Sequence, residues 1–105
     1  MLFRSDQSKG KLRPALVLCP LPGRHDDWLI CMISSQLEQA IPDFDETVTP
    51  EDDDFKQSGL KLSSLIRISR IAVVSGDILL GKLGQLDTQR LIRIRKKLSD
   101  WIVDA

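Results

Sequence analysis

Short apolar runs separated by polar turns make up most of the chain before its last twenty residues. Residues that favour turns separate these runs, and at residues 28–34 a helix is possible as well, although that run is short. Residues 28–34 (WLICMIS) are apolar without interruption, which suits a strand buried on both faces. The strands predicted in this way cover residues 14–19, 28–34, 60–68, 70–75 and 78–83, with a short edge strand around 46–48.

The segments between these runs are polar. Residues 4–13 (RSDQSKGKLR) predict a polar loop, and residues 20–27 a turn region rich in Pro, Gly and Asp. Residues 36–59 hold Pro42 and Pro50 and predict a long surface loop around the short edge strand. Residues 75–77 (SGD) predict a hairpin-like turn.

The C-terminal residues carry the clearest helical pattern. Asp87 is a favourable N-cap for a helix that begins at Thr88. The apolar side chains recur at helical spacing on one face, which predicts that they face the core: Leu91, Ile94, Leu98, Trp101 and Ile102. Four or five short strands followed by one packed helix close best as a small, strongly bent barrel or sandwich.

Length and composition limit the class of protein. The 105 residues are the length of one domain, with 42% hydrophobic and 29% charged residues, as in ordinary globular proteins. No apolar run approaches the roughly 20 residues of a membrane helix, and the start of the chain does not resemble a signal peptide. We therefore expect a cytoplasmic protein with no membrane partner, in which Cys19 and Cys31 are buried free thiols.

Charge is segregated along the chain although the formal net charge is zero. Residues 43–54 hold seven acids and no base, whereas residues 56–97 hold ten bases and two acids. The basic part could meet a polyanion. A solvated helix face beside a mobile acidic loop explains the same pattern, and charge alone favours this second interpretation.

Most familiar site chemistries have no candidate residues. One histidine, His25, and two separated cysteines do not supply a metal site, and no nucleotide-binding glycine motif is present, so we expect no metal and no cofactor. Arg13 precedes the first predicted strand, and Ser34 ends the next one. If these strands are neighbours, the guanidinium and the hydroxyl could hold a phosphodiester on one rim, and RNA could then be cleaved by its own 2′-OH.

Four short motifs, in order, resemble the MazF/PemK family of toxins. Residues 9–18 (KGKLRPALVL) are similar to the family's G-x-x-RP strand, and residues 33–36 (ISSQ) to its [IV]-T-[ST]-Q element. Residues 58–64 (SGLKLSS) resemble the opening of the following strand, and residues 71–86 followed by the helix match the family's closing order.

The resemblance implies a mainly β fold, an SH3-like small β-barrel of the CcdB/MazF type with a C-terminal helix. It implies a homodimeric, metal-independent endoribonuclease toxin that cleaves single-stranded RNA at short sequences and is neutralised by a cognate antitoxin. Carried over by position, Arg13, Ser34 and Ser35 are the expected catalytic residues. The expected RNA-binding residues are Lys9, Lys11, Trp28 and Gln36.

Three features depart from the family's pattern. Only Leu2 and Phe3 remain of the expected first strand, which predicts a truncated N-terminal strand in a single domain spanning residues 1–105. Serine replaces the usual threonine at position 34, so the β-methyl that restricts χ1 is missing. Residues 37–58 form a variable acidic loop that is longer than a tight connection requires.

Two alternatives share the same fold. The first is a catalytically impaired relative that only binds antitoxin or RNA, as the short first strand and Ser34 suggest. The second is a CcdB-like poison of DNA gyrase that acts through its C-terminal residues. The predicted burial of Trp101 and Ile102 speaks against this second alternative.

Overall fold

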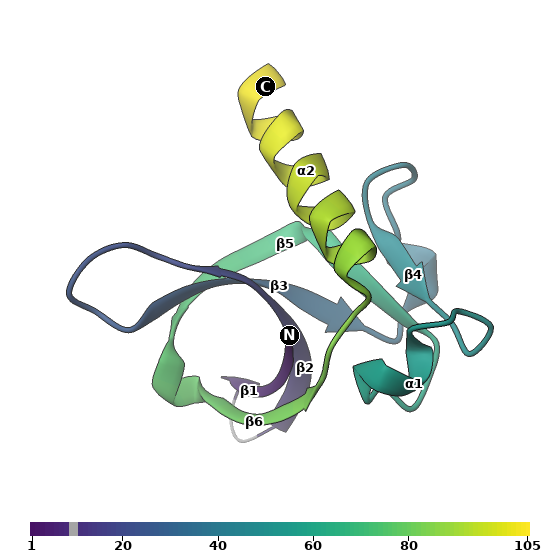
Figure 1. The fold of residues 1–105 in the computed structure, drawn as a ribbon, viewed down its shortest axis with the longest axis horizontal. Coiled ribbons are helices and arrows are strands. Elements are labelled where there is room, and N and C mark those ends of the chain that lie inside the picture. The colour runs from purple at the N-terminus through teal and green to yellow at the C-terminus, as the bar shows by residue number, and fades with distance from the viewer. Residues whose placement is uncertain (9–10) are drawn as a thin grey trace.

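The chain folds into a curved antiparallel sheet with one long helix packed against it (Figure 1). The computed structural model describes residues 1–8 and 11–105, and the side chains of residues 1–4 and 12–105. The strands are β1 (Leu2–Ser8), β2 (Lys11–Pro20), β3 (Asp27–Ser34), β4 (Glu46–Val48), β5 (Ser64–Ser75) and β6 (Leu79–Gly84). The α-helices are α1 (Phe55–Ser58) and α2 (Thr88–Asp104), and two 3₁₀ turns are η1 (Leu37–Gln39) and η2 (Gly76–Ile78).

The six strands follow the order β4-β5-β3-β2-β1-β6. Figure 1 shows that β1, β2, β3, β5 and β6 curl into a ring, while β4 and α1 lie outside it beside α2. A mainly β fold with a C-terminal helix was predicted correctly. The predicted barrel is an open one, because β4 and β6 remain the two edges of the sheet within the described chain.

The N-terminal segment differs from its prediction. Residues 4–8 and 11–13 are not a loop, since β1 runs to Ser8 and β2 begins at Lys11. β1 pairs with β2 on one side, as in Leu2 opposite Leu16, and with β6 on the other side. Backbone hydrogen bonds on both sides make this polar segment a strand, so Leu2 and Phe3 belong to a seven-residue strand inside the sheet.

The two strands predicted at 60–68 and 70–75 are one strand, β5, which begins later, at Ser64. A three-residue bulge interrupts its ladder, because Cys31 of β3 faces Ile71 whereas the next residue, Met32, faces Arg67. The Asp45 carboxylate supports this bulge by accepting hydrogen bonds from the Ser69 backbone N–H (3.0 Å) and hydroxyl (3.1 Å). The bulge bends β5, so its first half reaches β4 and its second half completes the ring.

Apolar side chains on the two faces of the sheet form two separate clusters. Neighbouring side chains of a strand point to opposite faces. Leu16 and Leu18 therefore join the larger cluster with Ile66, Ile94 and other buried residues. Ala15 and Val17 join a smaller cluster on the other face, which also contains Ile30 and is covered by partly buried hydrophobic residues, among them Phe3 and Trp28.

Helix α2 begins where it was predicted. The Asp87 carboxylate accepts a hydrogen bond of 3.0 Å from the Gln89 N–H, and Ile94 and Leu98 are buried against the sheet. The expected burial of Trp101 and Ile102 is wrong, since these side chains are 60% and 58% exposed. The last turns of the helix extend past the sheet (Figure 1), so the helical period continues where there is no core to cover.

The long segment predicted as a surface loop contains more structure than expected. The edge strand is found at Glu46–Val48 as predicted, while η1 and the short helix α1 were missed. Phe44 and Phe55 pack against the larger cluster and hold the segment on the body of the protein. Gly59 ends α1 at φ 76°, a left-handed conformation that glycine adopts without strain.

The two cysteines are free thiols, as expected. Cys31 is fully buried, and burial is the main cause that raises the pKa of its thiol to about 12. The expected burial of Cys19 is wrong, since this residue is only half-buried near the end of β2. In the described part of the chain, no helix is long and apolar enough to cross a membrane.

Candidate functional site

A cavity of about 440 Å³ lies where β2 begins and β3 ends. Its walls come from residues 12–14 of β2, residues 33–35 at the end of β3, and residues 60–62 with Ser64 on the approach to β5. The β2–β3 ladder pairs Ala15 with Met32, and the same register continued by two residues sets Arg13 opposite Ser34. Opposite residues of two paired strands share a face, so this register explains why both side chains line one cavity.

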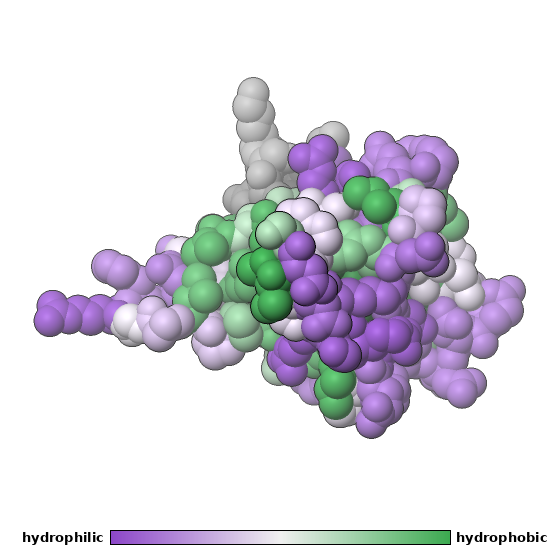
Figure 2. Space-filling view, turned by 90° about the horizontal axis from the view of Figure 1, so that it is seen from above, coloured by the Kyte–Doolittle hydropathy of each residue, from purple (hydrophilic) through white to green (hydrophobic). Residues whose placement is uncertain are grey.

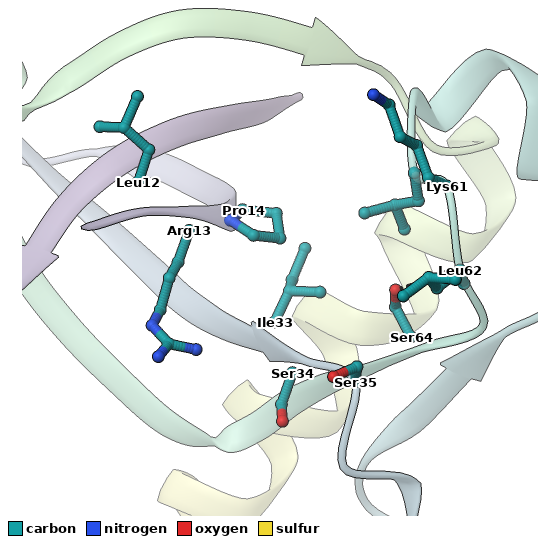
Figure 3. Close-up of a pocket in the computed structure, with 10 residues that line it drawn as sticks. Leu12, Arg13, Pro14, Ile33, Ser34, Ser35, Lys61, Leu62 and Ser64 are labelled. Atoms are coloured by element: carbon teal, nitrogen blue, oxygen red, sulfur yellow. Dashed lines mark hydrogen bonds between the residues drawn. The ribbon is translucent and has the colours of Figure 1, made fainter.

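The three residues expected to be catalytic therefore line one site. Figure 3 shows the Arg13 guanidinium and the Ser34 hydroxyl extending towards the same end of the cavity, with Ser35 beside Ser34. Arg13 and Ser35 are exposed and Ser34 is half-buried, so a ligand can reach all three. Their catalytic role stays a prediction, which this arrangement supports.

The Ser34 hydroxyl is held by its own backbone. The Gln36 N–H donates a hydrogen bond of 3.0 Å to Ser34 Oγ, which forms a tight turn as the chain leaves β3. The hydroxyl oxygen acts as the acceptor there, and its proton remains available for donation to a ligand. This bond restricts the serine χ1 angle, a constraint that the β-methyl of threonine would otherwise supply. Gln36 itself is exposed and does not line the cavity.

The wall opposite Arg13 was not predicted as part of the site. Gly59 turns the chain out of α1, and the following residues Leu60, Lys61 and Leu62 line the cavity. A Cβ at position 59 would collide with the carbonyl oxygen of Leu83, so β6 fixes the path of this wall. The signal that could have indicated Lys61 is its position in the "GLK" motif, two residues after a turn-forming glycine.

Trp28 does not join this cavity. It lies at the other end of β3, six residues before Ser34, which corresponds to about 20 Å along a strand. Its indole N–H donates a hydrogen bond of 2.7 Å to Asp26, and the ring packs over the smaller apolar cluster. Lys9 lies outside the described residues, and the side chain of Lys11 is likewise not described.

Part of the segregated charge is paired within the fold. Glu46 and Asp54 of the acidic segment are buried, and basic side chains of α2 reach them. Arg93 binds both oxygens of Glu46 at 2.8 Å, and Lys97 lies 3.2 Å from the same carboxylate. Arg90 bridges Asp54 at 2.8 Å and Glu46 at 3.2 Å. The structural interpretation of the charge pattern therefore holds for these residues, because their charges stabilise the packing of α2.

This ion cluster also shifts the titration of its acids. Burial alone would raise the pKa of Glu46, but hydrogen bonds from Arg93 and Lys97 outweigh burial and lower it. Burial opposes the shift of Asp54 in the same way, while hydrogen bonds from Arg90 and from the Asp87 backbone lower its pKa. Both carboxylates are therefore ionised at neutral pH.

The cavity can bind a phosphoryl group and leave room for a sugar. Arg13 can donate two parallel hydrogen bonds to phosphoryl oxygens, and the hydroxyl of Ser34 or Ser35 can donate another. Such donors stabilise negative charge that grows on the oxygens of a phosphate under attack. Across the described residues, no cluster of three or more His, Cys, Asp or Glu side chains is arranged to hold a metal ion.

Comparison with known proteins agrees with this fold. Residues 2–102 match the family described as PemK-like, MazF-like toxin of type II toxin-antitoxin system, which confirms the resemblance seen in the motifs. The structure is similar to that of the Mycobacterium tuberculosis toxin MazF-mt6, with a TM-score of 0.71 and 13% sequence identity. The similarity covers 97% of this chain and 95% of that chain, and at this identity it establishes the fold alone. No curated protein matches the sequence.

Proposed function

Because the chain belongs to the PemK-like, MazF-like toxins of type II toxin–antitoxin systems, we propose that it cleaves single-stranded RNA at short sequences without a metal ion. Members of this family are endoribonucleases. The observation that carries the proposal is the shared cavity of Arg13, Ser34 and Ser35, which combines a permanent positive charge with two hydroxyl groups. An RNA substrate is consistent with action in the cytoplasm.

The proposed reaction uses the RNA's own nucleophile. The 2′-hydroxyl loses its proton to water as its oxygen attacks the adjacent phosphorus, the bond from phosphorus to the 5′-oxygen breaks, and the leaving oxygen takes up a proton from water. The products are a 2′,3′-cyclic phosphate and a 5′-hydroxyl group. Arg13 holds the non-bridging oxygens and stabilises the charge of the pentavalent transition state, while Ser34 donates a further hydrogen bond.

The proposed partners are a cognate antitoxin and a second copy of the chain. An apolar cavity of about 380 Å³ near the end of α2 supports self-association, and its lining includes the exposed Ile41, Ile71 and Trp101. Figure 2 shows hydrophobic side chains gathered near the middle of the face seen from above, beside a hydrophilic area. The chain exposes 6772 Å², whereas a monomeric protein of this mass exposes about 5,900 Å². Sedimentation equilibrium tests the dimer, and a monomer at micromolar concentration would overturn it.

Two features of the domain description stay predictions. Residues 1–105 are proposed to form a single domain of the family. Residues 37–58 are proposed as the segment in which its members differ most.

RNA cleavage in the presence of EDTA tests the proposed function. The wild type is expected to cut single-stranded RNA with the metal chelated and to leave 2′,3′-cyclic phosphate ends. Arg13→Ala is expected to lose at least about 100-fold in cleavage rate, as for other donors that contact a transition state. Its thermal unfolding should match that of the wild type, because Arg13 is exposed.

The same proteins separate the alternatives. A wild type that binds RNA or antitoxin without cutting would indicate an impaired relative. The exposure of Trp101 and Ile102 keeps the gyrase alternative open to experiment, because these residues can reach a partner. Inhibition of DNA supercoiling by gyrase, with RNA left intact, would favour that alternative and overturn the nuclease.

A further inference from the structure

The cavity at Arg13 continues into a second hollow. A second hollow of about 300 Å³ adjoins it and shares four lining residues with it, namely Leu12, Pro14, Leu60 and Lys61. Arg4, Gly59 and Leu83 complete its lining. The two hollows therefore form one groove, which passes over Pro14 from the end of β3 towards the sheet edge at β6.

The described residues that line the groove carry charge of a single sign. Among the described residues that line it, the charged ones are Arg4, Arg13 and Lys61, and none is Asp or Glu. Acidic and basic residues are equally numerous in the chain, 15 of each, so this sorting is a property of the groove. Neither Arg4 nor Lys61 forms an ion pair with another described side chain, and both are exposed.

The pairing of β1 with β2 places Arg4 at the second hollow, and the turn at Gly59 places Lys61 there. Arg4 lies on β1 directly opposite Pro14 of β2, so both residues share one face of the sheet. Lys61 follows the left-handed Gly59, whose close approach to β6 fixes the wall. Figure 3 shows Lys61 extending towards the other end of the cavity from the Arg13 guanidinium.

The chemistry of the second hollow fits one nucleotide of a single strand. Single-stranded nucleic acid binds to grooves in which positive side chains follow the phosphates and flat or apolar surfaces receive the bases. Here the leucine and proline side chains shared by both hollows supply the apolar surface. Lys61 and Arg4 supply charges for the phosphate next to the one at Arg13.

We propose that this second hollow binds the nucleotide adjacent to the scissile phosphate, with Lys61 and Arg4 contacting the neighbouring phosphate. The inference rests on the proposed ribonuclease function and adds substrate-binding residues to it. Lys61 and Arg4 contribute binding in the ground state and in the transition state alike, so their loss weakens RNA affinity and leaves the chemical step unchanged.

The first experiment uses full-length protein and an RNA whose cleavage site has been mapped with the wild type. The same oligonucleotide with a single 2′-deoxy substitution at that site cannot be cut and reports binding alone. Lys61→Ala and Arg4→Ala are each expected to weaken its binding about five- to tenfold at low salt. The slope of log affinity against log salt concentration should become shallower by about 0.7 for each phosphate contact removed.

Matched controls separate the groove from general charge effects. Lys82→Ala removes a cation from β6 next to Leu83, and neighbouring side chains of a strand point to opposite faces. Lys56→Ala removes an exposed cation from α1. Both controls should bind RNA within about twofold of the wild type, and all four variants should unfold like it.

A shortened RNA identifies the subsite. Oligonucleotides that end at the scissile phosphate on one side or the other are compared for the wild type and Lys61→Ala. One of the two should bind both proteins equally, since it lacks the nucleotide that Lys61 contacts. At saturating RNA, Lys61→Ala should keep the wild-type cleavage rate within about twofold.

The outcomes distinguish this inference from the proposed function. A wild type that neither binds nor cuts RNA overturns both. Normal cleavage, together with Lys61→Ala and Arg4→Ala variants that bind RNA as the controls do, overturns the second subsite and leaves the ribonuclease intact. Unchanged RNA affinity combined with weaker binding of a poly-glutamate peptide would assign the hollow to an acidic polypeptide and overturn the inference.

Discussion

Two groups of basic side chains in this protein have opposite surroundings. Arg90, Arg93 and Lys97 of α2 meet the buried carboxylates of Glu46 and Asp54 at 2.8–3.2 Å. The second group, Arg4 and Lys61, lines a groove whose described lining contains no carboxylate. Both groups consist of arginine and lysine side chains. Among the described residues, only the first of these two groups forms ion pairs with carboxylates.

This difference shows which charges serve the fold and which are placed for a ligand. Side chains that satisfy buried carboxylates cannot turn to a substrate without leaving those carboxylates unpaired, which is costly. The helix with the highest density of positive charge is therefore a poor candidate for RNA binding. The groove has fewer charges, and these lie beside the residues that can act on a phosphodiester.

The largest expected effect on stability comes from Arg90→Ala. The change leaves the buried Asp54 without its arginine and removes one partner of Glu46, and breaking a buried pair of this kind costs about 3–5 kcal/mol. Urea unfolding measures the loss. Lys61→Ala serves as the comparison variant and should retain stability within about 0.5 kcal/mol, because Lys61 is exposed. Equal stability losses in the two variants would remove the distinction between the two groups.

Gly59→Ala is expected to have the next largest effect. Its side chain would meet the Leu83 carbonyl oxygen at a backbone φ of 76°, so we expect a loss of about 2 kcal/mol or more. Because Gly59 leads into the wall that contains Lys61, RNA affinity should fall as well. Gly81→Ala is the matched control, since a Cβ there meets no atom within 4 Å. A Gly59→Ala protein as stable as the control would show that the wall is not fixed by β6.

A falling pH is expected to weaken the ion cluster of Glu46 and Asp54 before it changes the positive charge of the groove. Folding lowers the pKa values of Glu46 and Asp54, whose ordinary values are 4.5 and 3.8. A lowered pKa in the folded state contributes stability that is present above the ordinary value and is lost as the pH falls through the folded-state value. The free energy of unfolding should therefore hold above about pH 5 and decline below about pH 4.5.

The variant Glu46→Gln tests this assignment, because it removes one of the two acids whose pKa values are lowered. Its stability should depend less on pH between 5 and 3 than that of the wild type. Identical slopes for the two proteins would show that other carboxylates cause the acid sensitivity.

The smallest expected effect is that of Ser34→Thr. The hydrogen bond from the Gln36 N–H already restricts the serine hydroxyl, so the added β-methyl should change the single-turnover cleavage rate by no more than about threefold. Ser35→Thr is the control at the neighbouring exposed position. A tenfold gain for Ser34→Thr would show that the turn does not position the hydroxyl.

The sequence predicted the site best where residues of suitable chemistry lie at the ends of two strands that follow one another in the chain. Arg13 and Ser34 flank two apolar runs, and adjacent antiparallel strands bring such positions together. The α2 boundary followed from Asp87, because a cap is a local interaction that the sequence itself contains. Lys61 was missed because its place depends on Gly59 meeting β6, a contact between segments more than twenty residues apart.

The wrong predictions have related causes. The side chains of β1 past Leu2 and Phe3 are polar, and its strand structure rests on backbone pairing with β2 and β6, which hydropathy does not report. β5 was divided in two because its bulge interrupts the alternation. Trp101 was assigned to the core because helical periodicity gives the face of a residue but not where the sheet beneath it ends.

Because Cys31 is buried, the rate at which reagents label its thiol reports how often the core opens. A thiol with a pKa of about 12 holds almost no thiolate at neutral pH, and no alkylating reagent can reach it while the strands are closed around it. Modification of Cys31 must therefore wait for the sheet to separate, whereas the half-buried Cys19 is accessible earlier. The labelling rates of the two thiols would then measure how often the core opens, and whether a bound partner keeps it closed.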